Sequence, residues 1–198
     1  QAGFLPESIP QPTGWEIAAS LKSAREVTGD FYDVFEFPDG KIGLVIADVC
    51  DKGLGAALFM TLFRSLIRAV ANIDFYSGTG DAELTSPDRR LENAMAFTNN
   101  YITTTHGQAS MFCTIFFGVL DPMTGTFTYV NGGHLPPLII NPLGIRETLK
   151  ASGPAVGVTP GSKFTIREVM IAPEEVLFAY TDGLTDTINP AGEYFDNQ

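Results

Sequence analysis

Three short acidic segments of this chain have the residue types and positions that metal chemistry needs. They are residues 29–33 (GDFYD), 47–49 (ADV) and 181–183 (TDG), and each lies at the edge of a strongly apolar run. Taken singly, each is an ordinary turn or helix cap, because Asp favours both. Taken together, they place Asp30, Asp48 and Asp182 at the ends of expected strands. This pattern predicts carboxylates that gather around metal ions.

The first two carboxylates are expected to face each other across a β-hairpin. Residues 31–37 and 41–47 predict two strands, and the sequence Pro-Asp-Gly at 38–40 predicts the turn between them. Equal steps from the turn pair Val34 with Leu44, Tyr32 with Ile46, and Asp30 with Asp48. Side chains that face each other lie roughly 5 Å apart at the β-carbon. A slip of one residue, or a bulge, would separate the last pair.

Two carboxylates this close need a positive partner. Two like unit charges about 4 Å apart repel by roughly 4 kcal/mol at an effective dielectric constant near 20. Neither acidic segment contains Lys or Arg, so a divalent cation is the simplest partner. Oxygen ligands without nearby His or Cys favour magnesium, manganese or calcium over zinc.

The third carboxylate, Asp182, follows the apolar run at 176–180. Such a run predicts a strand that is buried on both faces. Gly183 would let the backbone turn sharply after it and approach a ligand closely.

Composition limits the class of protein. The chain has 198 residues, of which 44% are hydrophobic and 18% charged, and we expect residues 1–198 to form a single domain. The net charge of −11, without a Lys/Arg-rich run, argues against a nucleic-acid partner. Cys50 and Cys113 lack CxxC spacing, so the sequence predicts free thiols in a reducing cytoplasm. No apolar run reaches the roughly 20 residues that span a bilayer, so we expect no direct membrane insertion.

The remaining pattern predicts an α+β fold. A wide apolar surface on a helix at 56–72 suggests burial between layers, and Ser86-Pro87 predicts the start of a second helix that ends near Thr103. Apolar runs at 111–120, 126–131, 138–140, 165–170 and 176–180 predict strands. Two helices between early and late groups of strands indicate a layered fold of mainly antiparallel sheets.

Four motifs in this order resemble the SpoIIE/RsbU-like branch of the metal-dependent protein phosphatases, which have the protein phosphatase 2C-type fold. They are the acidic segment at 29–33, the segment ADVCDKGLGAAL at 47–58, NGGHLPP at 131–137 and YTDGLTD at 180–186. The sequence FLP at 4–6 is similar to the end of the linker helix that precedes such domains. The resemblance runs from about residue 4 to the last residue.

The resemblance implies an αββα sandwich and two Mn²⁺ or Mg²⁺ ions that activate a water for attack on phosphoserine or phosphothreonine. Asp48 would bridge both ions, the carbonyl of Val49 would complete one site, and Asp182 would bind the other ion. Asp30 would bind a metal directly or through water. These three aspartates are therefore the expected catalytic residues.

Other residues carry weaker expectations. Arg25 could meet the substrate phosphate, Asp33 could support Asp30, and His134 is expected to have a structural hydrogen-bonding role. The chain also departs from the family pattern. Asp51 replaces the usual Gly, and the helix, strand and further metal ligand expected after Phe195 are missing, so we expect a truncated domain.

The resemblance implies a phosphatase that acts on a phosphorylated bacterial signalling protein, with a STAS-domain anti-anti-sigma factor as the expected substrate. It also implies an N-terminal sensory or regulatory domain, and a homodimer is one way in which such a protein could switch. Two alternatives stay open from the residues. One is a regulatory partner-binding module with an incomplete metal site, and the other is a calcium-stabilised structural domain.

Overall fold

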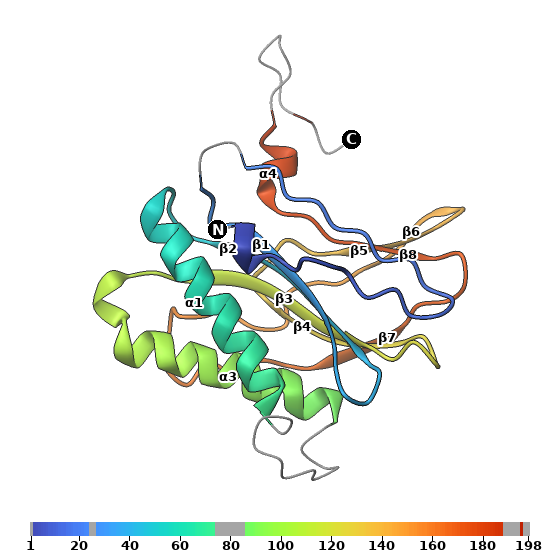
Figure 1. Ribbon diagram of the computed structural model, residues 1–198, viewed down its shortest axis with the longest axis horizontal. Coiled ribbons are helices and arrows are strands. Elements are labelled where there is room, and N and C mark those ends of the chain that lie inside the picture. The colour runs from blue at the N-terminus through green and yellow to red at the C-terminus, as the bar shows by residue number, and fades with distance from the viewer. Residues whose placement is uncertain (1, 24–26, 74–85, 188–194, 196–198) are drawn as a thin grey trace.

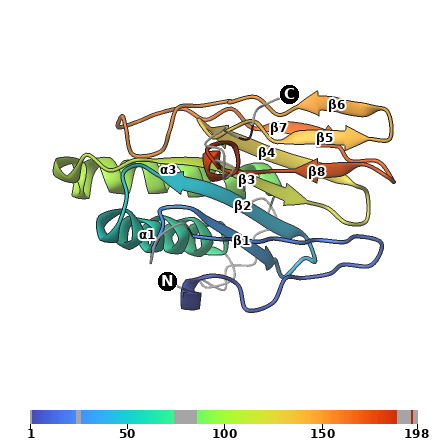
Figure 2. The ribbon, with the colours of Figure 1, turned by 90° about the horizontal axis from the view of Figure 1, so that it is seen from above.

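The larger sheet of the protein, sheet A, has five antiparallel strands. A computed structural model describes residues 2–23, 27–73, 86–187 and 195. Across sheet A the strands run in the order β1 (Phe31–Glu36), β2 (Ile42–Val49), β3 (Cys113–Leu120), β4 (Thr126–Gly132) and β7 (Arg167–Met170). Figure 2 shows this order, with β1 at one edge.

The predicted register of the first hairpin is confirmed. Val34 faces Leu44, and Tyr32 faces Ile46, across the ladder of β1 and β2. The turn closes because Gly40 adopts a φ of 79°, and its N–H donates to the carbonyl of Phe37 over 2.9 Å. A residue without a side chain adopts this left-handed conformation without steric cost. The turn thus sets the spacing that brings Asp30 toward Asp48.

The smaller sheet, sheet B, consists of β6 (Gly144–Thr148), β5 (Leu138–Asn141) and β8 (Val176–Phe178), in that order. The sequence did not indicate β6, because most of its residues are exposed and it has no apolar run. The prediction that residues 176–180 are buried on both faces is wrong. Val176 is 56% exposed and Phe178 40% exposed, since β8 is an edge strand and turns only Leu177 toward the core.

Sheet A packs on sheet B with one face and on helices with the other. Along β2 the residues alternate, because successive side chains point to opposite faces of a strand. Ile42, Leu44 and Ile46 contribute to the core between the sheets, whereas Val45 and Ala47 belong to the core beneath the helices. By the same alternation, Asp48 lies on the face of sheet A that is turned toward sheet B.

Two long helices, α1 (Leu54–Ala71) and α3 (Pro87–Thr105), pack against each other and cover the outer face of sheet A (Figure 1). The predicted start of α3 is confirmed, since the Ser86 side chain accepts a hydrogen bond from the N–H of Arg89. The predicted burial of the helix at 56–72 between layers is wrong. Leu54 and Leu58 are 70% and 63% exposed because α1 lies at the outside of the molecule.

Helix α1 is also the one helix in the described residues that could cross a membrane by length and composition alone. This is weak evidence, because the core helix of a soluble protein passes the same test. Met60, Phe63 and Ile67 of α1 are buried in the core beneath the helices.

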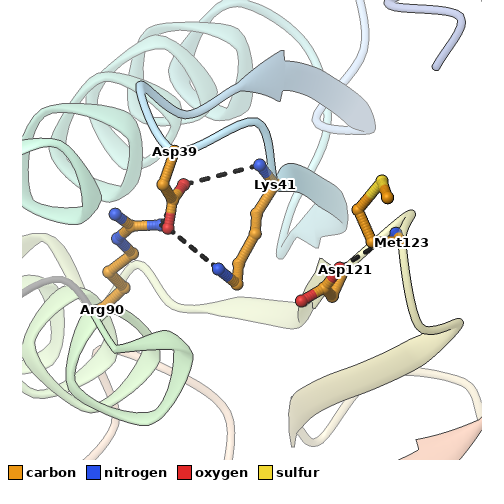
Figure 3. Close-up of polar contacts among 5 residues, drawn as sticks. All are labelled: Asp39, Lys41, Arg90, Asp121 and Met123. Carbon is orange, nitrogen blue, oxygen red and sulfur yellow. Dashed lines mark hydrogen bonds and ion pairs between the residues drawn. The ribbon is translucent and has the colours of Figure 1, made fainter.

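An ion-pair cluster fastens α3 to the first hairpin (Figure 3). Arg90, whose side chain is 4% exposed, donates to both oxygens of Asp39 over 3.1 and 3.2 Å. Lys41 reaches the same carboxylate over 3.1 Å. The guanidinium of Arg90 also lies 4.2 Å from the ring centre of Phe37. Burial alone would raise the pKa of Asp39, but the hydrogen bonds from Arg90 and Lys41 outweigh it and lower that pKa.

The fold class that the sequence predicted, α+β with mainly antiparallel sheets, is confirmed. Helices, sheet A and sheet B supply three successive layers. Besides α1 and α3, the described residues contain three short helical segments, η1 (Ala2–Phe4), η2 (Gly107–Ala109) and α4 (Asp182–Thr185).

Candidate metal centre

Three aspartates from distant parts of the sequence meet at one end of the space between the sheets. Asp30 immediately precedes β1, Asp48 lies near the end of β2, and Asp182 begins α4 after β8. Each offers a carboxylate oxygen, and the three oxygens lie within 4.8 Å of one another. The structure therefore brings together the three carboxylates that the sequence singled out.

The charges of this cluster are poorly compensated by protein groups. Burial, followed by the charges of Asp30 and Asp182, raises the pKa of Asp48 to about 7. Burial and the charge of Asp30 also raise the pKa of Asp182. Lys52 opposes both shifts but does not cancel them. Since a cation between the carboxylates would reverse this repulsion, the donor set fits a hard divalent ion.

Two glycines let the backbone close around the cluster. A β-carbon at Gly29 would lie 2.6 Å from the carbonyl oxygen of Val49, which is too close for any larger residue. A β-carbon at Gly183 would lie 3.5 Å from a carboxylate oxygen of Asp30. Gly183 therefore lies beside the cluster, and Val49 lies against the segment that leads to Asp30.

Two threonine hydroxyls form hydrogen bonds with Asp30, and the sequence did not reveal these contacts. Thr181 donates from Oγ1 to a carboxylate oxygen of Asp30 over 3.0 Å, and Thr28 accepts from the Asp30 N–H over 3.2 Å. Thr181 belongs to the third acidic segment, so its position beside an Asp was visible. Its partner was not, because that contact depends on how β8 docks.

The expectation that Asp33 supports Asp30 is wrong. Asp33 is 1% exposed and lies on the helix-facing side of sheet A, where it accepts from Arg64 over 3.1 Å and from Arg68 over 3.0 Å. The physical reason is the two-residue period of a strand, which turns residues three apart to opposite faces. Arg25, the expected phosphate contact, lies outside the described residues.

His134 makes hydrogen bonds, as expected. It follows β4 and contacts Thr114 and Tyr180 through its two ring nitrogens.

Comparison with protein families shows which proteins this chain resembles. The family model described as stage II sporulation protein E (SpoIIE) matches residues 38–198. The chain is 44% identical to Protein IcfG of Synechocystis sp. over 210 residues, which cover 100% of this chain and 33% of that protein.

Two further relatives are named for their activity. Phosphoserine phosphatase RsbP of Bacillus subtilis is 25% identical over 86% of this chain and 40% of its own length. Phosphoserine phosphatase RsbU of the same organism is 24% identical over 94% of this chain and 51% of its own length. The chain thus spans between a third and about half of the length of these three relatives.

Solved structures show the same fold. The SiaA-PP2C domain of Pseudomonas aeruginosa matches with a TM-score of 0.65 and 18% identity, over 85% of this chain and 61% of that chain. The serine/threonine phosphatase of S. agalactiae also matches with a TM-score of 0.65, at 14% identity, over 87% of this chain and 81% of that chain. At these identities the likeness establishes the fold alone, which is of the protein phosphatase 2C type.

Proposed function

Because this chain belongs to the stage II sporulation protein E (SpoIIE) family, we propose that it is a metal-dependent serine/threonine protein phosphatase. The observation that carries the proposal is the convergence of Asp30, Asp48 and Asp182 within 4.8 Å. Two Mn²⁺ or Mg²⁺ ions are the proposed cofactors, because carboxylate oxygens suit hard cations.

The proposed roles follow from where the groups lie. Asp48 is the proposed central ligand, in the role that the resemblance to the family implies. Asp182 and Asp30 would also hold the ions, and the Val49 carbonyl would complete one site. Bound ions of this kind supply a water that is activated near neutral pH and stabilise the charge of the transferred phosphoryl group. Thr181 orients Asp30 through its hydrogen bond. Asp182 is exposed, so a protein-bound phosphate can reach the cluster.

The proposed substrate is a phosphoserine or phosphothreonine on a bacterial signalling protein in the cytoplasm. The names of the relatives RsbP and RsbU, both phosphoserine phosphatases, support this substrate class. A STAS-domain anti-anti-sigma factor is the specific substrate that we propose. Since the relatives are two to three times longer, an N-terminal sensory domain in the whole protein is part of the same proposal.

We also propose that a further helix and a last strand complete this domain beyond residue 198. The support is the exposed apolar surface of sheet B, where Ile145 is 62% exposed, in addition to Val176 and Phe178 of β8. An αββα sandwich covers such a face with helices, because a sheet must bury its apolar side.

The test is hydrolysis of p-nitrophenyl phosphate by a chain extended past Gln198, with and without Mn²⁺. We expect Mn²⁺-dependent hydrolysis that Asp48→Asn reduces by about 10³-fold or more, because the bound ions carry several kcal/mol of the catalytic effect. The matched control is Asp88→Asn, which removes an exposed carboxylate on α3 and should leave the rate unchanged.

Two results would contradict the proposal. Partner binding without metal and without hydrolysis would identify a regulatory binding module of the same fold. Stabilisation by calcium, without hydrolysis under any metal, would identify a structural domain.

A further inference from the structure

The side chain of His134 bridges the two sheets beside the acidic cluster. We propose that it is a positioning residue, which holds the segment carrying Asp182 against the strands that carry Asp48. This inference rests on the proposed function, because it assigns His134 a role in assembling that metal site.

The backbone of His134 is fixed before its ring makes any contact. The side-chain oxygen of Asn131 accepts from the His134 N–H over 2.8 Å, and the Asn131 amide donates to the carbonyl of Leu149 over 3.0 Å. Gly133, between them, adopts a φ of 73°. Asn131 is fully buried, so this loop offers the ring one well-defined position.

Both ring nitrogens of His134 are used in the bridge. Nε2 lies 3.1 Å from the carbonyl oxygen of Tyr180, which only accepts, so Nε2 carries the proton. Nδ1 then accepts from the hydroxyl of Thr114 over 2.9 Å. The ring is 3% exposed, and its burial lowers the pKa of His134 to about 4, so it is neutral at pH 7. With both nitrogens bonded in a buried ring, His134 braces the site and does not touch substrate.

The two ends of the bridge lead to different ligands of the proposed site. Thr114 faces Asp48 across the ladder of β2 and β3, and its hydroxyl lies 3.5 Å from the Asp48 carbonyl oxygen. Tyr180 precedes Asp182 by two residues. One imidazole therefore connects the strand pair that places Asp48 with the segment that places Asp182.

A second hydrogen bond joins the segment of Asp182 to the acidic cluster, but its acceptor is a carboxylate. Thr181 donates to Asp30, and it uses a carboxylate oxygen for which a bound cation competes. The bonds of His134 involve no carboxylate, so they persist when the cluster binds metal. The bridge can therefore hold Asp182 in the same position with and without a bound cation.

Loss of the bridge should weaken metal binding without removing a ligand. Groups that orient metal ligands typically contribute about 10- to 100-fold to metal affinity. We therefore expect His134→Ala to raise the dissociation constant for Mn²⁺ by about 10- to 100-fold.

The experiment is a calorimetric titration with Mn²⁺ at pH 7.5, on the purified chain extended past Gln198, without substrate. The matched control is His106→Ala, which removes the other histidine of the chain at the C-terminal end of α3. His106 packs edge-on against Phe59, with 5.6 Å between ring centres. Its removal should change the Mn²⁺ dissociation constant by less than about 2-fold, which separates the bridge from a general loss of packing.

Two Thr114 variants keep the test decisive if His134→Ala fails to fold. Thr114→Val removes the hydroxyl at nearly constant volume and should raise the Mn²⁺ dissociation constant by about 3- to 10-fold, while Thr114→Ser should restore it. Wild-type affinity in folded His134→Ala or Thr114→Val overturns the inference alone. Absence of Mn²⁺ binding to the extended wild-type chain overturns the proposed function as well.

Discussion

Two carboxylate sites lie on opposite faces of sheet A, and they balance their charge in opposite ways. Asp33, on the helix side, is 1% exposed and is bonded to Arg64 and Arg68 of α1. Asp30 and Asp48, on the side of sheet B, meet another carboxylate instead of an arginine. The first site is complete within the chain, whereas the second needs a positive charge from outside.

The pKa directions show what this difference means. Burial raises the pKa of Asp33, but the charges of Arg68 and Arg64 both work against that shift. Burial also raises the pKa of Asp48, and there the neighbouring carboxylates add to the shift. A buried pair of opposite charges stabilises a fold only as a unit. A cluster of like charges, in contrast, indicates a site kept for a ligand.

Removal of the Asp33 carboxylate should have the largest effect on stability. Asp33→Ala should lower the free energy of unfolding by about 3 to 5 kcal/mol, because it leaves two guanidinium groups without their carboxylate. Urea denaturation measures this loss. Glu36→Ala, an exposed carboxylate on the same strand, is the control and should change stability by less than about 0.5 kcal/mol. A loss of stability for Asp33→Ala as small as that of the control would contradict the charge balance described for Asp33, Arg64 and Arg68.

A smaller effect should come from the close approach at the unbalanced site. Gly29→Ala places a β-carbon 2.6 Å from the Val49 carbonyl oxygen, so the backbone must shift. Overpacking of this kind costs about 1 to 3 kcal/mol, and thermal unfolding monitors it. Gly55→Ala, where a β-carbon meets nothing within 4 Å, is the matched control and should be neutral or stabilising. Equal stability of the two variants would contradict the geometry described for Gly29.

Removal of a charge from the acidic cluster should stabilise the folded chain when no metal is bound. Asp48→Asn should raise the unfolding free energy in chelator by roughly 1 to 2 kcal/mol at pH 8, since it removes repulsion that solvent only partly screens. The pKa of Asp48 is raised to about 7 in the folded chain, from 3.8. Below pH 3.8 its contribution to stability is fully present, and it is lost as the pH rises through about 7.

This dependence of stability on pH is what should be measured for Asp48→Asn. Unfolding curves at pH 4 to 8 in chelator should show the loss in the wild-type chain, and the variant should lack that component. Destabilisation of the variant in chelator at pH 8 would mean that the carboxylates do not repel one another.

The smallest effect should come from Lys41, which is less buried than Arg90 in the cluster of Figure 3. Lys41 contributes a 3.1 Å ion pair to Asp39, which Arg90 already neutralises. Lys41→Ala should therefore cost about 0 to 1 kcal/mol, measured by urea denaturation. A cost similar to that of Asp33→Ala would show that burial does not determine the strength of these pairs.

The sequence was sufficient for features with a short-range cause. The hairpin register followed from the turn and from the two-residue period of strands, and the start of α3 followed from Ser86 and Pro87. The meeting of Asp30 with Asp48 depends on the same register. Asp182 reaches them through the docking of sheet B. Its position at the end of an expected strand indicated that it would join them, but no strand register determined the contact.

Features that depend on long-range packing were missed or wrong. The exposure of Leu54 and Leu58 reflects which side of α1 has a neighbour, and an apolar sequence does not show this. The strand β6 has no apolar run because it is exposed at the edge of sheet B. The bridge of His134 joins residues 20 and 46 positions away, so its partners are fixed only by the fold.

Metal binding by the three aspartates is tested most directly by a crystal structure of an extended chain soaked with Mn²⁺, with anomalous difference density measured at the cluster. We expect Mn²⁺ peaks bound by the carboxylates of Asp30, Asp48 and Asp182. A well-ordered cluster without an anomalous peak, at Mn²⁺ concentrations that saturate the soak, would contradict it.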